Sequence, residues 1–476
     1  MSNSIFSRWS PHQRPLSDYR LSFRNSKTSP ESTELSVQTQ SQQPERSVET
    51  TNLETTERSL NPSTLQAWLQ VIVNFLVMMN SFGLIQSFGI FQLPYEISLK
   101  SAPSTVAWIG SVHIFFVYFL GTFSGWALDH GWYKRLLVLG SIFQIVGLIA
   151  AGYSDSFVKA FFFHGVFQGI GHGLMFCPAV TMTAVFFEGS RSKMTALGIA
   201  GCGASFGGII FPLIARYTII TKGISFTMWI MCCVVSFTSI LIVLLARTGP
   251  SRKYSAASDD SRTSKKRIVD WHAFKEPTYA LYVIAMFFVF VGLWIPFFYI
   301  REFSADALHV SKSESFIMLI ILNAAGIPGR IVPALFADLL IGTLNMYIIT
   351  LLLTSAILLF WPLVSTEVGM FGWTAAYGFG AAGVSSLLQA GLTSINDEPT
   401  KTGQKIGMAF TVVGFASLVG GPIGGELIRI GEETRVAGPE AYVWMIVFTG
   451  VIMFAGAVTL CVARLKRTGY RFLIKV

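Results

Sequence analysis

Charged residues are scarce in this sequence. Only 13% of its 476 residues are Asp, Glu, Lys or Arg, whereas hydrophobic residues make up 52%. Soluble domains average about 25% charged residues, so a water-soluble globular protein of this composition would expose far too much apolar surface. A surface that faces lipid removes the difficulty, because a bilayer accepts Leu, Ile, Val and Phe side chains. The composition therefore predicts an integral membrane protein.

Cysteine is also scarce, and its spacing excludes the common metal sites. The cysteines lie inside apolar stretches without C-x-x-C spacing: Cys177, Cys202, Cys232, Cys233 and Cys461. Small packing residues explain them better than disulfides or metal ligands. The sequence has neither the H-E-x-x-H motif of zinc proteases nor a P-loop. We therefore expect no enzyme, no ATP-driven pump, no metal and no cofactor.

Long apolar stretches recur along the chain. The hydrocarbon core of a bilayer is about 30 Å thick and needs roughly 20 residues of apolar helix. Twelve stretches of suitable length are predicted to span it: 67–91, 105–128, 136–153, 157–180, 195–217, 225–246, 278–300, 315–338, 346–364, 370–392, 406–428 and 441–463.

Polar segments divide these spans into two sets of six. Residues 1–64 are rich in Ser, Thr, Gln and Glu, lack the apolar core of a secretory signal, and are predicted to form a disordered tail. We expect a six-helix bundle over 65–246, a polar linker over 247–276, a second six-helix bundle over 277–464 and a short tail over 465–476.

Basic residues predict the orientation. Most of the 35 lysines and arginines fall in the two tails, the linker and the loops on one side of the predicted membrane. The positive-inside rule then places both termini in the cytosol. The net charge of +9 thus reflects loops and tails rather than a nucleic-acid partner. We expect the plasma membrane, with the vacuolar membrane as the alternative.

The two predicted halves repeat each other. Three features recur 209 residues later, in the corresponding span: Gly83-Leu84 as Gly292-Leu293, Asp129 as Asp338, and Gly169-x-Gly171 as Gly378-x-Gly380. Such parallel six-helix repeats resemble those of major facilitator transporters, which rock one half against the other.

The loop between spans two and three carries the strongest local motif, Gly125-Trp-Ala-Leu-Asp129-His-Gly131-Trp-Tyr-Lys134-Arg135. It resembles the major facilitator signature G-x-x-x-D-x-G-x-x-K/R-K/R, which implies that this cluster and Asp338 latch the cytosolic gate. Gly125 permits close helix contact, and Asp129 can face the positive end of a neighbouring helix. An ordinary basic turn is the alternative explanation.

Further segments resemble the fungal branch of the monocarboxylate-porter family. The resemblance covers residues 64–468 and implies an all-α fold of twelve transmembrane helices in two six-helix bundles, with a small carboxylate as substrate. The similar segments are Phe88-Gly-Ile-Phe91-Gln92-Leu-Pro-Tyr95-Glu96, Gly203 to Pro212, Pro296-Phe-Phe-Tyr299, Gly329-Arg330 with Ala337-Asp338, and Gly421-Pro-Ile-Gly424-Gly425.

Arg330 is the most informative single residue. It stands about 12 Å inside the predicted span eight, where a charge costs at least about 2.5–3.5 kcal/mol. It must therefore face the bundle interior or a water-filled cavity. The resemblance implies that it binds a substrate carboxylate, which a guanidinium can grip with two hydrogen bonds. A structural arginine bonded to helix carbonyls is the alternative.

The chain departs from the acid-transporting members of that family. Gln86 stands where they carry a lysine, and Gly326 stands where they carry the acidic partner of the arginine. Both departures argue against direct proton–lactate symport. Fungal relatives with such changes include vitamin carriers and proposed exporters of secondary metabolites.

Other polar and aromatic residues within the spans could line a cavity. Hydrogen bonds between helices are the competing role for the amides, and lipid contact is the competing role for the aromatics. Histidines could relay protons, although packing explains each of them more simply. The candidates are Asn80, Gln86, Gln168, Asn323 and Gln389; Trp294, Phe298 and Tyr299; and His113, His164 and His172.

These features predict a secondary transporter that moves a small organic solute, a carboxylate or a carboxylate-bearing metabolite, across the lipid bilayer. Two alternatives stay open: an exporter of a secondary metabolite, and a sensor on the same fold that binds solute without moving it. Whether protons drive transport is also open.

Overall fold

The computed structural model describes residues 64–101, 103–248, 268–395, 401–434 and 439–469. The predicted tail over 1–63, most of the linker and the last seven residues lie outside the described residues. The expected disorder of the tail and the domain boundaries that fall there therefore stay predictions.

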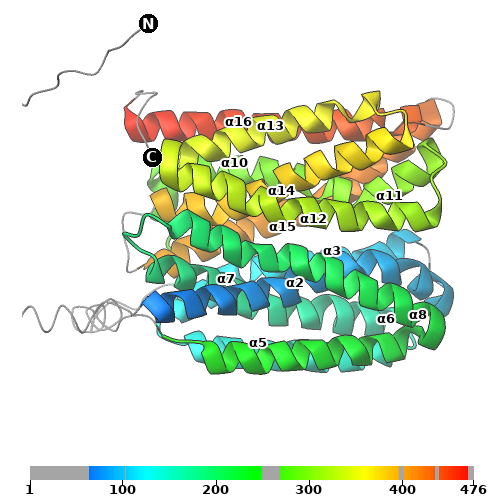
Figure 1. Ribbon diagram of the computed structural model, residues 1–476, viewed down its shortest axis with the longest axis horizontal. Helices are drawn as coiled ribbons and strands as arrows, with labels where there is room; N and C mark the ends of the chain where they lie inside the picture. Colours follow the sequence, from blue (N-terminus) through cyan, green and yellow to red (C-terminus); the bar gives the residue numbers. More distant parts are fainter. Residues whose placement is uncertain (1–63, 102, 249–267, 396–400, 435–438, 470–476) are drawn as a thin grey trace, which may run out of the picture. The chain divides into compact units, whose positions relative to one another are not determined.

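Helices form all the regular secondary structure within these ranges, without strands. Figure 1 shows them running side by side, with the first-half helices, blue to green, below those of the second half. Their bounds are α2 Thr64–Leu99, α3 Pro103–Phe119, α4 Gly121–Asp129, α5 Tyr133–Gly152, α6 Phe157–Ala160, η1 Phe161–Phe167, α7 Gln168–Phe186, α8 Lys193–Leu245, η2 Ala273–Lys275, α10 Pro277–Leu293, α11 Ile295–Ala307, α12 Lys312–Phe336, η3 Ala337–Ile341, α13 Thr343–Leu359, η4 Trp361–Leu363, α14 Glu367–Ile395, α15 Thr402–Thr434, η6 Pro439–Tyr442 and α16 Val443–Thr468.

Ten helical segments among the described residues are long and apolar enough to cross a membrane. One of them, α8, has 53 residues, or about 80 Å if it were straight, more than twice the thickness of the hydrocarbon core. The 29 residues of α14 extend about 44 Å and are long enough for a further passage. If α8 counts twice and α14 is added, the total agrees with the twelve predicted passages.

Gly223 divides α8 into two passages. Its φ of 78° lies in the left-handed region that suits glycine, which has no Cβ to collide with the following carbonyl. The hydroxyls of Thr218 and Thr227 lie 2.8 Å apart across this bend. The chain therefore folds back here, between the predicted spans 195–217 and 225–246.

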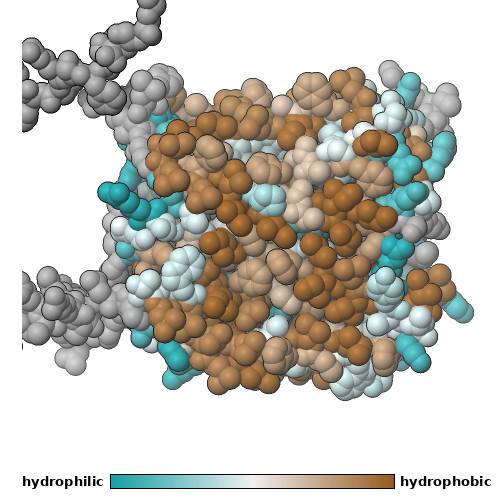
Figure 2. All heavy atoms as spheres, viewed as in Figure 1, coloured by the Kyte–Doolittle hydropathy of each residue, from teal (hydrophilic) through white to brown (hydrophobic). Residues whose placement is uncertain are grey.

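The surface has the apolar belt that a membrane protein needs. Figure 2 shows brown hydrophobic residues over the middle of this face and teal hydrophilic residues toward its left and right ends. On α5, four large apolar side chains are exposed on the outside of the bundle: Val138, Leu139, Ile142 and Val146. Lipid tails can cover such side chains, whereas water cannot do so without cost.

The two halves meet along a few helices. Within the first half α2 packs along α8, and within the second half α10 packs along α16 and α12 along α14. Between the halves, α15 packs on α3 and α4, while α12 packs on α8. These three helix pairs between the halves form much of the contact between them.

Candidate functional site

A cavity of about 30 Å³ lies between the halves, lined from both. A buried water needs roughly 10–15 Å³ on this measure, so the cavity has room for about two waters. A larger solute can enter only if the halves separate. Residues of α2, α3 and α8 line it from the first half, and residues from α10 through α12 and from α14 line it from the second half.

Arg330 supplies the positive charge in this cavity. Its Nε donates to the Ser205 hydroxyl of α8 at 3.3 Å, and its Nη1 donates to the Ser386 hydroxyl of α14 at 3.4 Å. Among the described residues no carboxylate forms an ion pair with it. The guanidinium therefore has long hydrogen bonds to neutral partners and retains the capacity to bind an anion.

Aromatic rings form one wall of the cavity. Phe82 of α2 stacks on Trp294, with an interplanar angle of 5° and ring centroids 6.2 Å apart. The Tyr118 ring lies 6.0 Å from Phe82. Because Phe82 and Trp294 belong to different halves, this stack must open when the halves separate. The amides of Gln86, Asn323 and Gln389 complete the polar part of the lining.

Other predicted binding residues lie outside the cavity lining. Asn80 accepts a hydrogen bond from Thr238 of α8 at 3.0 Å, so it joins two helices. Tyr299 donates to the Gly421 carbonyl at 3.0 Å, and Phe298 is largely exposed. Gln168 is buried within the first half, where its amide has no hydrogen-bond partner.

The cavity also contains residues that the sequence analysis missed, chiefly Phe82, Tyr118 and Ser205. Phe82 and Ser205 lie beside or within recognised glycine motifs, but neither motif indicates which way a side chain points. The letters Gly203-Ala-Ser205-Phe-Gly207 also spell the G-x-S-x-G of a hydrolase. Here they lie inside helix α8, whereas the hydrolase elbow is a strand-to-helix turn, so Ser205 is not placed as a nucleophile.

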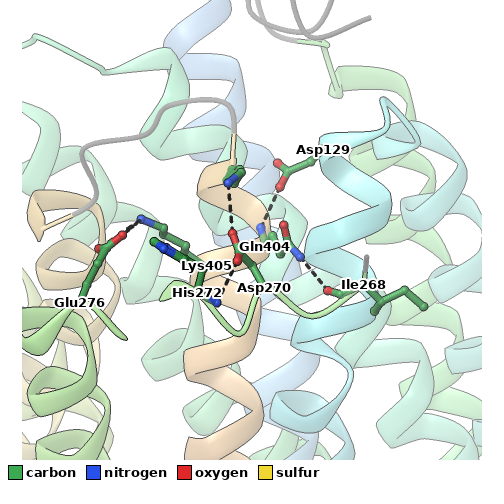
Figure 3. Close-up of polar contacts among 8 residues, drawn as sticks. Asp129, Ile268, Asp270, His272, Glu276, Gln404 and Lys405 are labelled. Carbon is green, nitrogen blue, oxygen red and sulfur yellow. Dashed lines mark hydrogen bonds and ion pairs between the residues drawn. The ribbon is translucent and has the colours of Figure 1, made fainter. Parts of the chain in front are cut away.

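Contacts of the loop signature join the two halves at the start of α15. The Asp129 carboxylate accepts a hydrogen bond from the backbone amide of Gly403 at 3.1 Å. It accepts another from the amide of Gln404 at 2.8 Å (Figure 3). These amides belong to the first turn of α15, so the carboxylate faces the positive end of a helix of the other half. A Cβ on Gly125 would collide with the Gly403 carbonyl oxygen, so glycine is required for this approach.

The second half makes the reciprocal contact. Asp338 accepts hydrogen bonds from the amides of Met194 at 3.1 Å and Thr195 at 2.7 Å, and from the Thr195 hydroxyl at 2.7 Å. These groups form the first turn of α8. Each half therefore caps a helix of the other half with a carboxylate.

The remaining residues of the loop signature shape the turn after α4. Gly131 has a φ of 81°, which explains why glycine stands there. Lys134 and Arg135 are exposed. The Arg135 guanidinium lies 5.8 Å from the centre of the Trp132 ring.

The described end of the linker also binds the start of α15. The Lys405 ammonium lies 3.1 Å from a Glu276 carboxylate oxygen, and the Gln404 side chain donates to the Ile268 carbonyl at 2.9 Å (Figure 3). Lys401 pairs with Asp270 at 3.1 Å. Partial burial raises the pKa of Asp270, but the hydrogen bond and charge of Lys401 outweigh it and lower this pKa below its usual value.

Known proteins resemble this chain over most of its length. The family described as Major Facilitator Superfamily matches residues 68–395. An MFS-type transporter of Gibberella zeae is 32% identical over 82% of this chain and 86% of that protein. The aspyridones efflux protein of Emericella nidulans is 28% identical over 82% of this chain and 77% of its own length. The agnestins efflux protein of Paecilomyces divaricatus is 28% identical, with coverages of 87% and 92%.

A solved structure shows the same fold. The human organic anion transporter MFSD10 superposes with a TM-score of 0.60 at 14% identity, covering 83% of this chain and 98% of that one. None of these names identifies the monocarboxylate-porter branch. The superfamily prediction, by contrast, is confirmed, because the match spans more than half of the chain and one relative exceeds 30% identity. This chain belongs to the Major Facilitator Superfamily.

Proposed function

We propose that this transporter exports a secondary metabolite that carries an aromatic ring and an anionic group. Two of its relatives are named as efflux proteins for particular metabolites. These names favour the exporter alternative over import of a simple monocarboxylate. The substitutions at Gln86 and Gly326, relative to acid-transporting members, favour it as well.

The unpaired Arg330 in the cavity carries this proposal. A guanidinium without a carboxylate partner costs free energy in a dry site, and an anionic substrate group would offset that cost. The neighbouring Phe82 and Trp294 rings offer faces for an aromatic group. The amides of Gln86 and Asn323 offer donors and acceptors for further polar groups.

The reciprocal caps provide a gate for alternating access. With Asp129 on α15 and Asp338 on α8, that end of the cavity is held shut. Loss of both caps would let the halves separate there and admit the metabolite. The positive-inside rule assigns this end to the cytosol, and the plasma membrane is the location that export requires.

Cysteine labelling on intact cells tests the orientation. Lys275 near the linker and Lys222 near Gly223 are both exposed and lie at opposite ends of the predicted membrane. We expect an impermeant maleimide to label Lys222→Cys from outside and Lys275→Cys only after permeabilisation. The reverse pattern would invert the topology.

Uptake into inside-out vesicles tests the function, with 2-naphthoate and its neutral amide as probes. Arg330→Gln should reduce saturable uptake of the carboxylate by about 10-fold or more, because a charge-assisted hydrogen bond contributes roughly 1.5–3 kcal/mol. Arg330→Lys should restore only part of it, since an ammonium lacks the planar fork. Amide transport should change much less.

Arg429→Gln is the matched control, because Arg429 is exposed and pairs with Glu426 and Glu433 on its own helix. Its uptake of both probes should equal that of the wild type. Equal losses of both probes in Arg330→Gln, in proportion to the amount of folded protein, would show that Arg330 is only structural. Saturable binding of naphthoate without any flux would instead indicate a sensor.

A further inference from the structure

Three histidines form a buried polar chain in the first half, and none of them lines the cavity. His113 of α3 and His172 of α7 share a hydrogen bond of 2.7 Å between Nε2 and Nδ1, and their rings stack 4.8 Å apart. His164 of η1 lies 6.1 Å from His113 between ring centroids. Its Nδ1 is 3.0 Å from the Tyr95 hydroxyl.

The four residues are ordered along the membrane axis. Tyr95 is four residues from the end of α2, and His113 is ten residues from the start of α3. His164 and His172 are seven and fifteen residues from the start of α6, at the same side of the bundle. At about 1.5 Å per residue they lie roughly 6, 10, 15 and 22 Å from that end, in the order Tyr95, His164, His113, His172.

The histidine pair leaves its outer nitrogens without a partner. His113 Nδ1 and His172 Nε2 are both buried, and neither has a hydrogen-bond partner. The side-chain amide nitrogen and oxygen of Gln168 also lack partners. Buried polar atoms are nearly always paired in proteins. In a pair of neutral imidazoles, one ring donates to the other, so either tautomer leaves one free lone pair and one free N–H. Such a pair can accept a proton at one end and release one at the other.

The backbone beside these residues is also irregular. His164 lies in η1, a π-helical turn from Phe161 to Phe167, and such turns interrupt α-helices mostly at functional sites. The wider turn shifts His164 relative to His172 on the same passage.

Other ionisable groups lie on the helices that pack against the histidines, and the charged ones are near the ends of the membrane passages. The middle of these passages therefore offers a proton no carboxylate. These groups are Glu96 on α2; Tyr118 on α3; Asp129 on α4; Tyr133, Lys134 and Arg135 on α5; Lys159 on α6; Cys177 on α7; Lys193, Cys202, Arg216, Tyr217, Lys222, Cys232 and Cys233 on α8; and Lys405, Glu426, Arg429, Glu432 and Glu433 on α15.

We propose that Tyr95, His164, His113 and His172 form a proton-binding relay that couples transport to a proton gradient. The coupling part rests on the proposed transport function. A proton enters from the Tyr95 end, binds the free lone pair of the His113–His172 pair, and shifts along their shared hydrogen bond. Only the N–H bonds of the histidines and the O–H bond of Tyr95 break and form.

Packed aromatic rings connect the relay to the contact between the halves. Phe176 follows His172 by one helical turn and stacks 4.9 Å from Phe410 of α15. It also lies 5.3 Å from Phe82, which lines the cavity. A charge on the histidine pair is costly while the site is dry. Proton binding therefore favours the conformation in which water reaches the pair, and so shifts the balance between states.

A pH-jump experiment tests the relay without any substrate. Full-length protein in liposomes on a solid-supported membrane should give a transient current when the pH steps between about 7.5 and 5, because the conformation in which water reaches the pair takes up protons. The double variant His113→Gln, His172→Asn places amides near the bonded nitrogens and cannot be protonated. We expect the displaced charge to fall at least about 10-fold in this variant, because the pair is the site at which the proton binds.

His309→Asn is the matched control. His309 is exposed and has a φ of 55°, which asparagine tolerates, so its transient should equal that of the wild type. A folded double variant with an undiminished transient would overturn the relay. If the double variant does not fold, ¹⁵N NMR of the wild type decides, with single histidine variants for assignment. Rings that stay neutral from about pH 8 to 5 would overturn the relay, and rings that protonate would support it.

The two proposals fail separately. A current without Arg330-dependent naphthoate uptake would refute the proposed substrate and leave the relay intact. Naphthoate uptake that depends on Arg330, without a pH-jump current in the wild type, would refute the relay alone.

Discussion

Asp129 and Asp338 stand 209 residues apart in the sequence, and each caps a helix of the opposite half. Asp129 bonds two backbone amides of α15, whereas Asp338 bonds two amides and one hydroxyl at the start of α8. The two caps lie in equivalent places of a repeated fold. Neither half can move away at this end without breaking both.

The surroundings of the two caps differ. The start of α15 is also bonded to the linker end through Lys405 with Glu276 and Lys401 with Asp270. The tight approach of Gly125 to Gly403 belongs to the same contact, while the position equivalent to Gly125 is Ala334. The α15 side therefore has contacts with the linker that the α8 side lacks among the described residues.

Removing both caps should have the largest effect. Replacing a capping side chain by alanine costs about 0.5–2 kcal/mol, so the variant with Asp129→Ala and Asp338→Ala should weaken closure by about 1–4 kcal/mol. Uptake of 2-naphthoate per folded molecule should fall roughly 10-fold or more, with each single variant between it and the wild type. If one single variant reproduces the whole loss, the caps are not equivalent. Unchanged rates would remove them from the gate.

We expect the second-largest effect at the close approach of α4 and α15. Gly125→Ala places a methyl group against the Gly403 carbonyl, and overpacking of this kind costs about 1–3 kcal/mol. We expect slower transport with normal insertion. Ala334→Gly, the mirror change, should have little effect on rate. Equal effects of the two changes would show that both sides are packed alike.

Substitutions at the two ends of the Lys405–Glu276 ion pair should destabilise the protein to different extents. Lys405 is 4% exposed and Glu276 is 44% exposed, so Glu276→Gln leaves a buried ammonium without its carboxylate. This should destabilise the protein by about 1–2 kcal/mol, because an uncompensated buried charge is costly. Lys405→Met removes that charge and should cost less. Thermal unfolding in nanodiscs measures both, and the opposite order would mean that water solvates Lys405.

The Lys401–Asp270 pair should have the smallest effect. Its partly exposed lysine limits the contribution to roughly 0.2–1 kcal/mol. Because the pKa of Asp270 is lowered in the folded protein, this stabilisation is present at neutral pH. It is lost as the pH falls through that lowered pKa. Asp270→Asn should abolish this acid-dependent part of the unfolding profile and leave stability below that pH unchanged.

The sequence predicted where the chain crosses the membrane better than it predicted the breaks within the membrane helices. Spans 105–128 and 278–300 were each expected as one helix, but the structure separates α3 from α4 and α10 from α11. Pro296 lies in the first turn of α11, where its missing N–H causes no loss. Hydropathy alone does not distinguish such a break from a continuous helix, because the residues around it remain apolar.

The sequence by itself determined that this is an integral membrane protein and that its two halves repeat. It also determined in which predicted span or loop Arg330 and the loop signature lie. Those properties follow from local composition and spacing. Only the tertiary structure decided that Arg330 meets Ser205 and Ser386, from two other helices. It also decided that Asn80 joins helices instead of lining the cavity, and that His113 pairs with His172. The rotation of each helix about its axis sets these contacts, and in helices apolar on nearly every side the residue pattern does not encode that rotation.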